Sequence, residues 1–179
     1  MSLCETLSPP PSSLALPDFL DRYANVVEHS PWVAEKAWQQ GMSVAQDTPD
    51  GLAERLGKVL MAAPREEQID VIRAHPDLAG KAALAGELTR ASLDEQAGAG
   101  LDQCSPDELA RFERLNAAYK ARFGFPFVVA VKGLDRHAIL AAFEERLTHD
   151  EEQERETAIT QIIKIVRLRL HAMTAAASA

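Results

Sequence analysis

Apolar side chains recur every three or four residues along most of this chain. That spacing places them on one face of an α-helix and so predicts helices with one buried side. The clearest runs are Leu52, Leu56, Val59 and Leu60, and, nearer the C-terminus, Ile159, Ile162, Ile163, Val166 and Leu170. The pattern therefore predicts a chain built mainly from short helices.

Capping residues followed by proline precede three of the predicted helices, at Ser30-Pro31, Thr48-Pro49 and Ser105-Pro106. Proline suits the first helical turn because the N–H that it lacks would have no partner there. We expect helices from Pro17 through Tyr23, from Ser30 through Trp38, from Thr48 through Leu60, from Pro64 to about Ala74, through Leu78, Ala82 and Leu84 up to Gly86, from Ser105 to Phe123, from Asp135 through Leu147, and from about Asp150 to Ala172.

The run FGFPFVVAVKG breaks the helical periodicity. It is rich in aromatic and β-branched residues, contains Pro126, and has no evident strand partner. We therefore predict an all-α, single-domain bundle of short helices with one irregular extended segment near residues 124–131. Residues 1–16, which include PPPSS, are expected to form a flexible lead-in. Residues 17–173 would form the helical domain and residues 174–179 a C-terminal tail.

Composition excludes several classes of partner. A chain of 179 residues suits one domain, and its formal net charge of −8 offers no basic face for nucleic acid. No run approaches the roughly 20 apolar residues that span a bilayer. Cys4 and Cys104, the only cysteines, lack the spacing of a disulfide framework. With an N-terminus that lacks the pattern of an export signal, these features predict a cytoplasmic protein that binds neither nucleic acid nor membrane.

The tripeptide His75-Pro76-Asp77 falls at a predicted helix end. Proline disfavours the α conformation in the residue before it, so the helix should end near Ala74. Histidine titrates closest to neutral pH and is the commonest general acid or base. His75 is therefore a candidate catalytic residue, although a polar residue before proline can also end a helix without any further role.

Ser92-Leu93-Asp94-Glu95 has the S-x-x-E spacing of a capping box, in which the glutamate side chain reaches back to the start of its own helix. A glutamate in the first turn also lies at the positive end of a helix and stays ionised. It could then orient a histidine or accept a hydrogen bond from a ligand, while Gln96 offers both a donor and an acceptor. The two roles of Glu95 are compatible only if the cap does not use its carboxylate.

Two further features suggest ligand contacts. Arg169 falls at the edge of the apolar face of the last predicted helix, and Arg167 falls at the opposite margin. A guanidinium that points inward needs an anionic or carbonyl partner, which can be a substrate or a structural carboxylate. The run FPFVVAV is expected to be extended and to have no neighbouring strand. Its backbone amides and carbonyls could then hydrogen-bond to a flat polar ligand, or they could bond to loops and water instead.

Other classes of function leave weaker signals. HPD is also the signature of J-domain co-chaperones, which would make this chain a helical protein-interaction module without enzymatic activity. Here, however, the preceding helix reads REEQIDVIRA and the next residue is Leu78, whereas J domains surround HPD with basic residues. No pair of candidate histidines has the H-x-x-x-H or H-E-x-x-H spacing of a metal site on a helix. We expect no metal site.

Taken together, these elements resemble the 2-oxo-4-hydroxy-4-carboxy-5-ureidoimidazoline (OHCU) decarboxylase family of purine catabolism. The resemblance rests on HPDLAGKAA, then SLDEQAGAGLDQCSPDELARFERLNAAYKARFGFPFVVAVKG, then KIVRLRL, and covers about residues 17–173. It implies an all-α homodimer, without metal or organic cofactor, that converts OHCU to (S)-allantoin. That step follows uricase and hydroxyisourate hydrolase in urate breakdown.

The resemblance also implies which residues form the site. His75, Glu95 and Arg169 would be catalytic, with Arg167 the less favoured alternative to Arg169. His75 would deliver a proton to one face of the ring. The substrate-binding residues would be Pro76, the loop from Ser92 through Glu95 to Gln96, and the backbone of Phe127, Val128, Val129, Ala130 and Val131.

Overall fold

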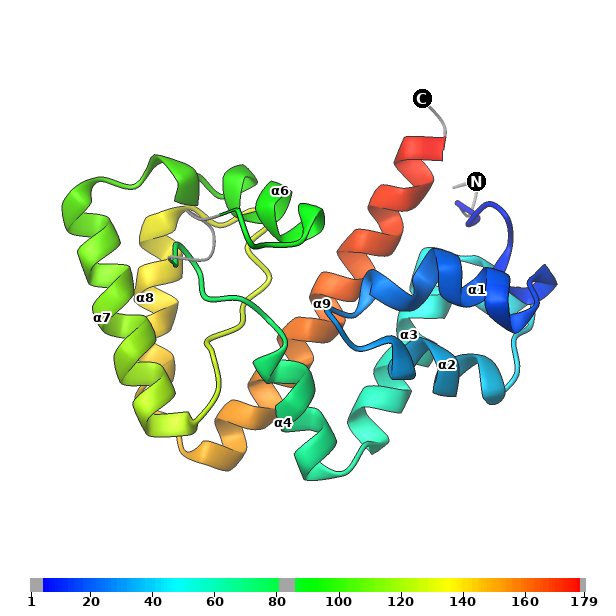
Figure 1. Cartoon of the computed structure of the whole chain (residues 1–179), viewed down its shortest axis with the longest axis horizontal. Coiled ribbons are helices and arrows are strands. Elements are labelled where there is room, and N and C mark those ends of the chain that lie inside the picture. The colour runs from blue at the N-terminus through cyan, green and yellow to red at the C-terminus, as the bar shows by residue number, and fades with distance from the viewer. Residues whose placement is uncertain (1–4, 81–85, 178–179) are drawn as a thin grey trace. The chain divides into compact units, whose positions relative to one another are not determined.

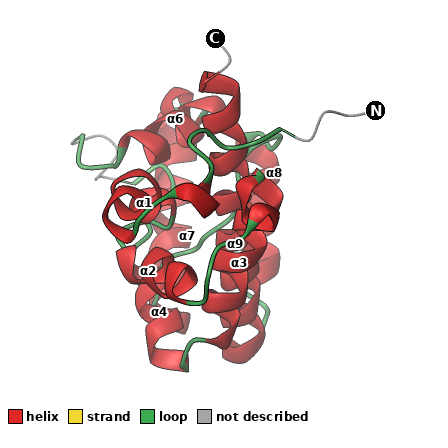
Figure 2. Ribbon diagram, turned by 90° about the vertical axis from the view of Figure 1, so that its right-hand side faces the viewer, coloured by secondary structure: helices red, strands yellow, loops and turns green. Residues whose placement is uncertain are grey.

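The computed structural model describes residues 5–80 and 86–177, and in these residues all regular structure is helical (Figure 1 and Figure 2). The predicted all-α, single-domain class is confirmed. The α-helices are α1 (Leu16–Tyr23), α2 (Pro31–Gln39), α3 (Pro49–Ala62), α4 (Arg65–Arg73), α6 (Arg90–Gly98), α7 (Pro106–Phe123), α8 (Arg136–Arg146) and α9 (Glu151–Ala177). Short 3-10 turns lie at Pro11–Ser13, Ala24–Val26, Val44–Asp47 and Leu101–Gln103.

The predicted helix starts at Thr48, Ser105 and Asp135 are confirmed as side-chain caps. The Thr48 hydroxyl accepts a hydrogen bond from the Gly51 N–H at 3.1 Å, and the Asp135 carboxylate accepts one from Ala138 at 2.8 Å. Ser105 and Glu108 form a capping box, in which each side chain accepts from the other residue's N–H. These bonds satisfy amides that the first turn leaves without a helical partner.

The predicted helix through Leu78, Ala82 and Leu84 is not borne out where it can be compared. Leu78 and Ala79 form a turn, and residues 81–85 lie outside the described part of the chain. At the other end of the sequence, α9 continues to Ala177, beyond the predicted end at Ala172.

Two compact units divide the domain, and unit 1 comprises residues 1–74 and 162–179. Within it, α2 packs against both α1 and α3. Its buried apolar side chains include Phe19, Tyr23, Val33, Leu52, Leu56, Leu60, Ile72, Ile162, Val166 and Leu170. The apolar stripes that predicted these helices therefore form this core.

The segment before α1 is packed in unit 1 rather than free. Leu7 is only 1% exposed, and its N–H donates to the Asp47 carbonyl at 2.7 Å. The Ser12 hydroxyl donates to the Asp47 carboxylate at 2.8 Å, and the Trp38 indole N–H donates to the Leu14 carbonyl at 3.1 Å. These long-range contacts distinguish residues 7–14 from the flexible lead-in that their composition suggested.

Unit 2, residues 75–161, is built on an aromatic core between α7 and α8, which pack together (Figure 1). Phe127 stacks on Phe143 with ring centroids 3.8 Å apart. Tyr119 meets both rings edge-on, at 5.3 and 5.8 Å. Because Phe127 belongs to the extended segment 124–131, that segment is fixed by burying its aromatic side chain instead of by strand pairing.

None of the helices in the described ranges is long and apolar enough to cross a membrane.

Replacing Gly51 tests a close backbone approach at the start of α3. A Cβ there would lie 1.7 Å from the Ala45 carbonyl oxygen, so the turn before α3 would have to move. Overpacking of this kind costs about 1–3 kcal/mol. We expect Gly51→Ala to lower the free energy of unfolding by about 2 kcal/mol or more, as measured by urea denaturation.

The control is Gly98→Ala, in α6, where an added Cβ would meet nothing within 4 Å. It should be neutral or should stabilise by about 0.4–1 kcal/mol, because alanine lowers the entropy of the unfolded chain. Equal stability of the two variants would contradict the close approach at Gly51.

Glu108 makes stability depend on pH. The Ser105 N–H and the Arg136 guanidinium, at 2.8 Å each, hold the pKa of Glu108 below its ordinary value of 4.5. A pKa that is lower in the folded state gives stability that is complete above the unfolded pKa and is lost as pH falls through the folded one. We expect the stability difference between the wild type and Glu108→Gln to shrink as pH falls from 6 to 3, measured by urea unfolding at each pH. A difference that stayed constant would contradict the assignment.

Candidate functional site

His75 follows the end of α4 and is the first residue of unit 2. The helix stops at Arg73, as the sequence predicted from Pro76, and His75 is 7% exposed. The role of His75 as a general acid stays a prediction.

Gln96 clamps the loop that follows His75. Its side-chain nitrogen donates to the Asp77 carbonyl at 3.3 Å, and its oxygen accepts from the Ala79 N–H at 3.0 Å. Gln96 is 7% exposed, so both bonds lie in a largely buried position. The sequence predicted Gln96 as a donor and acceptor for ligand, whereas here both functions hold the protein's own loop.

Helix α7 holds the same loop from residues that the sequence did not single out. The Asn116 side chain donates to the Leu78 carbonyl at 3.0 Å, and the Lys120 ammonium lies 2.6 Å from the Asp77 carboxylate. The loop is compact, since a Cβ on Gly80 would lie 2.8 Å from that of Asp77. Asn116 and Lys120 lie inside the family-like run LNAAYKARFGFPF, but no local signal shows what they bind.

The predicted capping box at Ser92 is wrong. Thr89 is the N-cap of α6, and its hydroxyl accepts a hydrogen bond from the Ser92 N–H at 3.3 Å. Ser92 is therefore the third helical residue and is 4% exposed. Residues 92–96 are helical rather than a binding loop, and Glu95 lies beyond the position that a capping-box glutamate occupies.

The extended segment 124–131 has the irregular backbone that the sequence predicted. Phe127, Val128 and Val131 are buried, whereas Val129 and Ala130 are partly exposed. The Val128 carbonyl accepts from Arg146 at 2.7 Å, and the Ala130 N–H donates to the Gln161 side chain at 3.1 Å. Both partners belong to unit 2 and were missed in the sequence.

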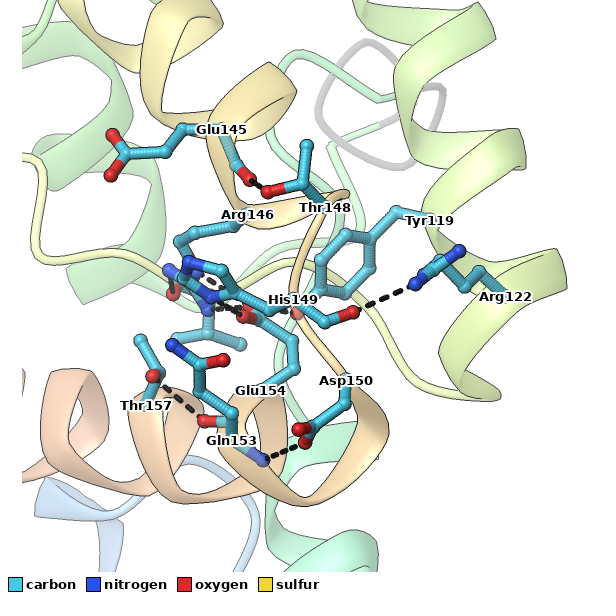
Figure 3. Close-up of polar contacts among 11 residues, drawn as sticks. Tyr119, Arg122, Glu145, Arg146, Thr148, His149, Asp150, Gln153, Glu154 and Thr157 are labelled. Atoms are coloured by element: carbon cyan, nitrogen blue, oxygen red, sulfur yellow. Dashed lines mark hydrogen bonds and ion pairs between the residues drawn. The ribbon is translucent and has the colours of Figure 1, made fainter.

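Arg146, which binds the Val128 carbonyl, also belongs to a buried ionic cluster with Tyr119, His149 and Glu154 (Figure 3). The Glu154 side chain is fully buried and receives the Tyr119 hydroxyl and the Arg146 guanidinium, each at 2.5 Å. His149 Nδ1 lies 2.9 Å from its second oxygen. Burial and the bond to Glu154 raise the pKa of Tyr119, so its hydroxyl stays protonated and remains a donor.

Arg169 lies in unit 1, at a buried ion pair. Its guanidinium is 2.8 Å from the Glu28 carboxylate, with side chains 9% and 2% exposed, and it donates to the Val26 carbonyl at 3.3 Å. This is the structural carboxylate that the sequence left open as an alternative to substrate. Arg167 is half exposed and lies 3.3 Å from Asp50. A contact of Arg169 with substrate stays a prediction.

Across residues 5–80 and 86–177, no group of three or more His, Cys, Asp and Glu side chains is arranged to hold a metal ion. Burial raises the pKa of the Cys104 thiol, which disfavours the nucleophilic thiolate. The assignment of the site to His75, Glu95, Gln96 and the backbone of residues 127–131 stays a prediction.

Comparison with known proteins identifies the family of the chain. The OHCU decarboxylase family matches residues 12–171, which span both units. A 2-oxo-4-hydroxy-4-carboxy-5-ureidoimidazoline decarboxylase from Haloferax volcanii is 43% identical over 152 residues, covering 85% of this chain and 86% of that protein. The protein of that name from Mus musculus is 38% identical over 160 residues, covering 89% of this chain and 88% of its own.

Among solved structures, (S)-allantoin synthase superposes with a TM-score of 0.72 at 29% identity, over 91% of this chain and 52% of that one. The match by sequence extends through HPDL, the α6 run and FGFPF, and the match by structure covers the same helical domain. This chain belongs to the OHCU decarboxylase family.

Proposed function

We propose that this protein decarboxylates OHCU to (S)-allantoin in urate breakdown, as a carboxy-lyase that needs no metal or organic cofactor. The observation that carries the proposal is His75, buried on a loop that Gln96 clamps to α6, the helix that also bears Glu95. The named relatives support the same reaction. The proposal includes a homodimer, as the resemblance implies, and a cytoplasmic location, as the cysteines and the N-terminal sequence predict.

The substrate can undergo this reaction with acid–base groups alone. The bond between ring carbon C4 and its carboxylate breaks, carbon dioxide leaves, and the electron pair enters the conjugated ring as an enolate-like species. One proton must then be added, and adding it to a fixed face gives one enantiomer. The protein therefore has to hold the carboxylate out of the ring plane and place a single acid.

In this proposal, His75 is the acid, and Pro76 and Ser92 contact the substrate beside it. Glu95 sets the protonation of the histidine or binds the 4-hydroxyl group. Backbone groups of segment 127–131 bind the ring and ureido atoms, and Arg169 contacts a substrate oxygen. Because Thr89 caps α6, a role of Glu95 in the reaction is separate from the start of that helix.

Replacing His75 tests the acid. General acid catalysis commonly contributes about 10²- to 10⁴-fold in rate. We expect His75→Gln to lower kcat for freshly generated OHCU by at least about 10²-fold and to leave racemic allantoin as the product, as measured by circular dichroism at the product band. His137→Gln is the control, since that side chain is 72% exposed. Stereospecific turnover by a folded His75→Gln protein would exclude the assignment.

Replacing Glu95 separates catalysis from helix capping. Because Thr89 caps α6, Glu95→Gln should leave the thermal midpoint almost unchanged while lowering kcat by about 10²-fold. Asp94→Asn, one position earlier on α6 and 68% exposed, should change neither quantity. A Glu95→Gln variant with normal turnover would show that this carboxylate has no part in the reaction.

A further inference from the structure

We propose that Arg146 and Gln161 are positioning residues that fix the two peptide groups flanking Val129. Arg146 binds the Val128 carbonyl and Gln161 binds the Ala130 N–H, both on one edge of segment 124–131. The N–H and C=O of Val129 then both point from the opposite edge toward the substrate. The inference rests on the proposed function and names the donor and acceptor pair through which the backbone would read the substrate's amide edge.

The orientation of each peptide group follows from its fixed end. The Val128 carbonyl accepts from Arg146 at 2.7 Å, and the Ala130 N–H donates to Gln161 at 3.1 Å. In the described residues the only cis peptide is Ser8–Pro9, so both peptides beside Val129 are trans. In a planar trans peptide, C=O and N–H point in opposite directions. The N–H of Val129 therefore points away from Arg146, and its C=O points away from Gln161.

Residues 126–131 have neither a helix nor a turn, and the proposal takes them as extended. In an extended chain, the N–H and C=O of one residue face the same side, as in the hydrogen-bonded pairs of antiparallel strands, so the two directions then coincide. Within the described residues, no protein group bonds to either backbone group of Val129, which is partly exposed. Such a pair complements a cyclic amide or urea, in which N–H and C=O lie side by side. OHCU carries that chemistry in its ring.

Arg146 is held firmly enough to act as a fixed point. Its side chain is 8% exposed, pairs with Glu154 through Nε and Nη2, and uses Nη1 for the Val128 carbonyl (Figure 3). Its guanidinium also stacks 4.4 Å from the centre of the Phe127 ring. The planar fork makes these contacts at once, which the single ammonium of a lysine cannot do.

The test compares Gln161→Met, which removes the acceptor, with Gln161→Glu, which keeps an acceptor oxygen at the same place. We expect Gln161→Met to raise KM for OHCU and Kd for (S)-allantoin about five- to tenfold, the usual worth of one net hydrogen bond. Its kcat should stay within about twofold, because a contact equal in the ground and transition states changes only KM. Gln161→Glu should restore KM and Kd to within about twofold of the wild type.

Asp135→Ala is the control for stability. It removes the cap of α8, another side-chain bond to a backbone N–H in unit 2, without touching segment 124–131. It should lower Tm and leave KM and Kd unchanged. If KM followed Tm across these variants, the role of Gln161 would be structural and the inference would fail.

The outcomes also separate this inference from the proposed function. A wild-type protein that neither turns over OHCU nor binds (S)-allantoin would overturn both. A wild-type protein that does both, with an unchanged Gln161→Met variant, would overturn only the positioning role. For Arg146→Lys we expect a larger rise in KM, and a folded variant with normal KM would exclude Arg146. The Gln161 pair decides the proposal if Arg146→Lys does not fold.

Discussion

The buried carboxylate of Glu154 is the constraint on which the rest of unit 2 depends. A fully buried charge without partners costs several kcal/mol, and removing one partner of such a pair typically costs about 3–5 kcal/mol. Here the partners come from α7 through Tyr119, from the end of α8 through Arg146, and from the following loop through His149. Satisfying this one charge therefore fixes three segments against the start of α9. Arg146 extends the constraint to the backbone of Val128.

Helix α7 links the ionic cluster to the loop after His75. Asn116 and Lys120 lie four residues apart, on one face of the helix, and both bind that loop. Tyr119, between them in sequence, reaches the buried carboxylate of Glu154. Helix α7 thus fixes the position of the His75 loop relative to segment 124–131, although the two segments are far apart in the sequence. The proposed acid and the proposed backbone contacts share a single rigid support.

Much of the fold could be predicted because its signals are local. Proline after a capping residue correctly marked the starts at Ser105 and Thr48, where the cap and its amide are three residues apart. The S-x-x-E spacing failed at Ser92, because Thr89 offers an equally good hydroxyl one turn earlier and the helix starts there. The spacing of residues alone could not show which hydroxyl, that of Thr89 or that of Ser92, caps α6.

Most of the contacts that build the site join distant residues, so the sequence could not show them. Asn116 and Leu78 are 38 positions apart, and Gln161 and Ala130 are 31 apart. The sequence singled out His75 and Gln96 by their chemical type, but it did not show the partners of Gln96. The tripeptide HPD, shared with J domains, likewise predicts a break between helices, and only the residues around it identify the family.

The left-handed backbone of Ala79 makes the loop after His75 depend on the packing of α6 and α7. Its φ of 49° lies in the left-handed region, which costs a residue with a Cβ about 1–2 kcal/mol. The bond from its N–H to Gln96 and the bond from Asn116 to the preceding carbonyl offset that cost only when α6 and α7 are both in place. An isolated or half-folded chain would relax this turn and release the histidine beside it. The proton transfer proposed for His75 would therefore depend on the assembly of α6 and α7 around this turn.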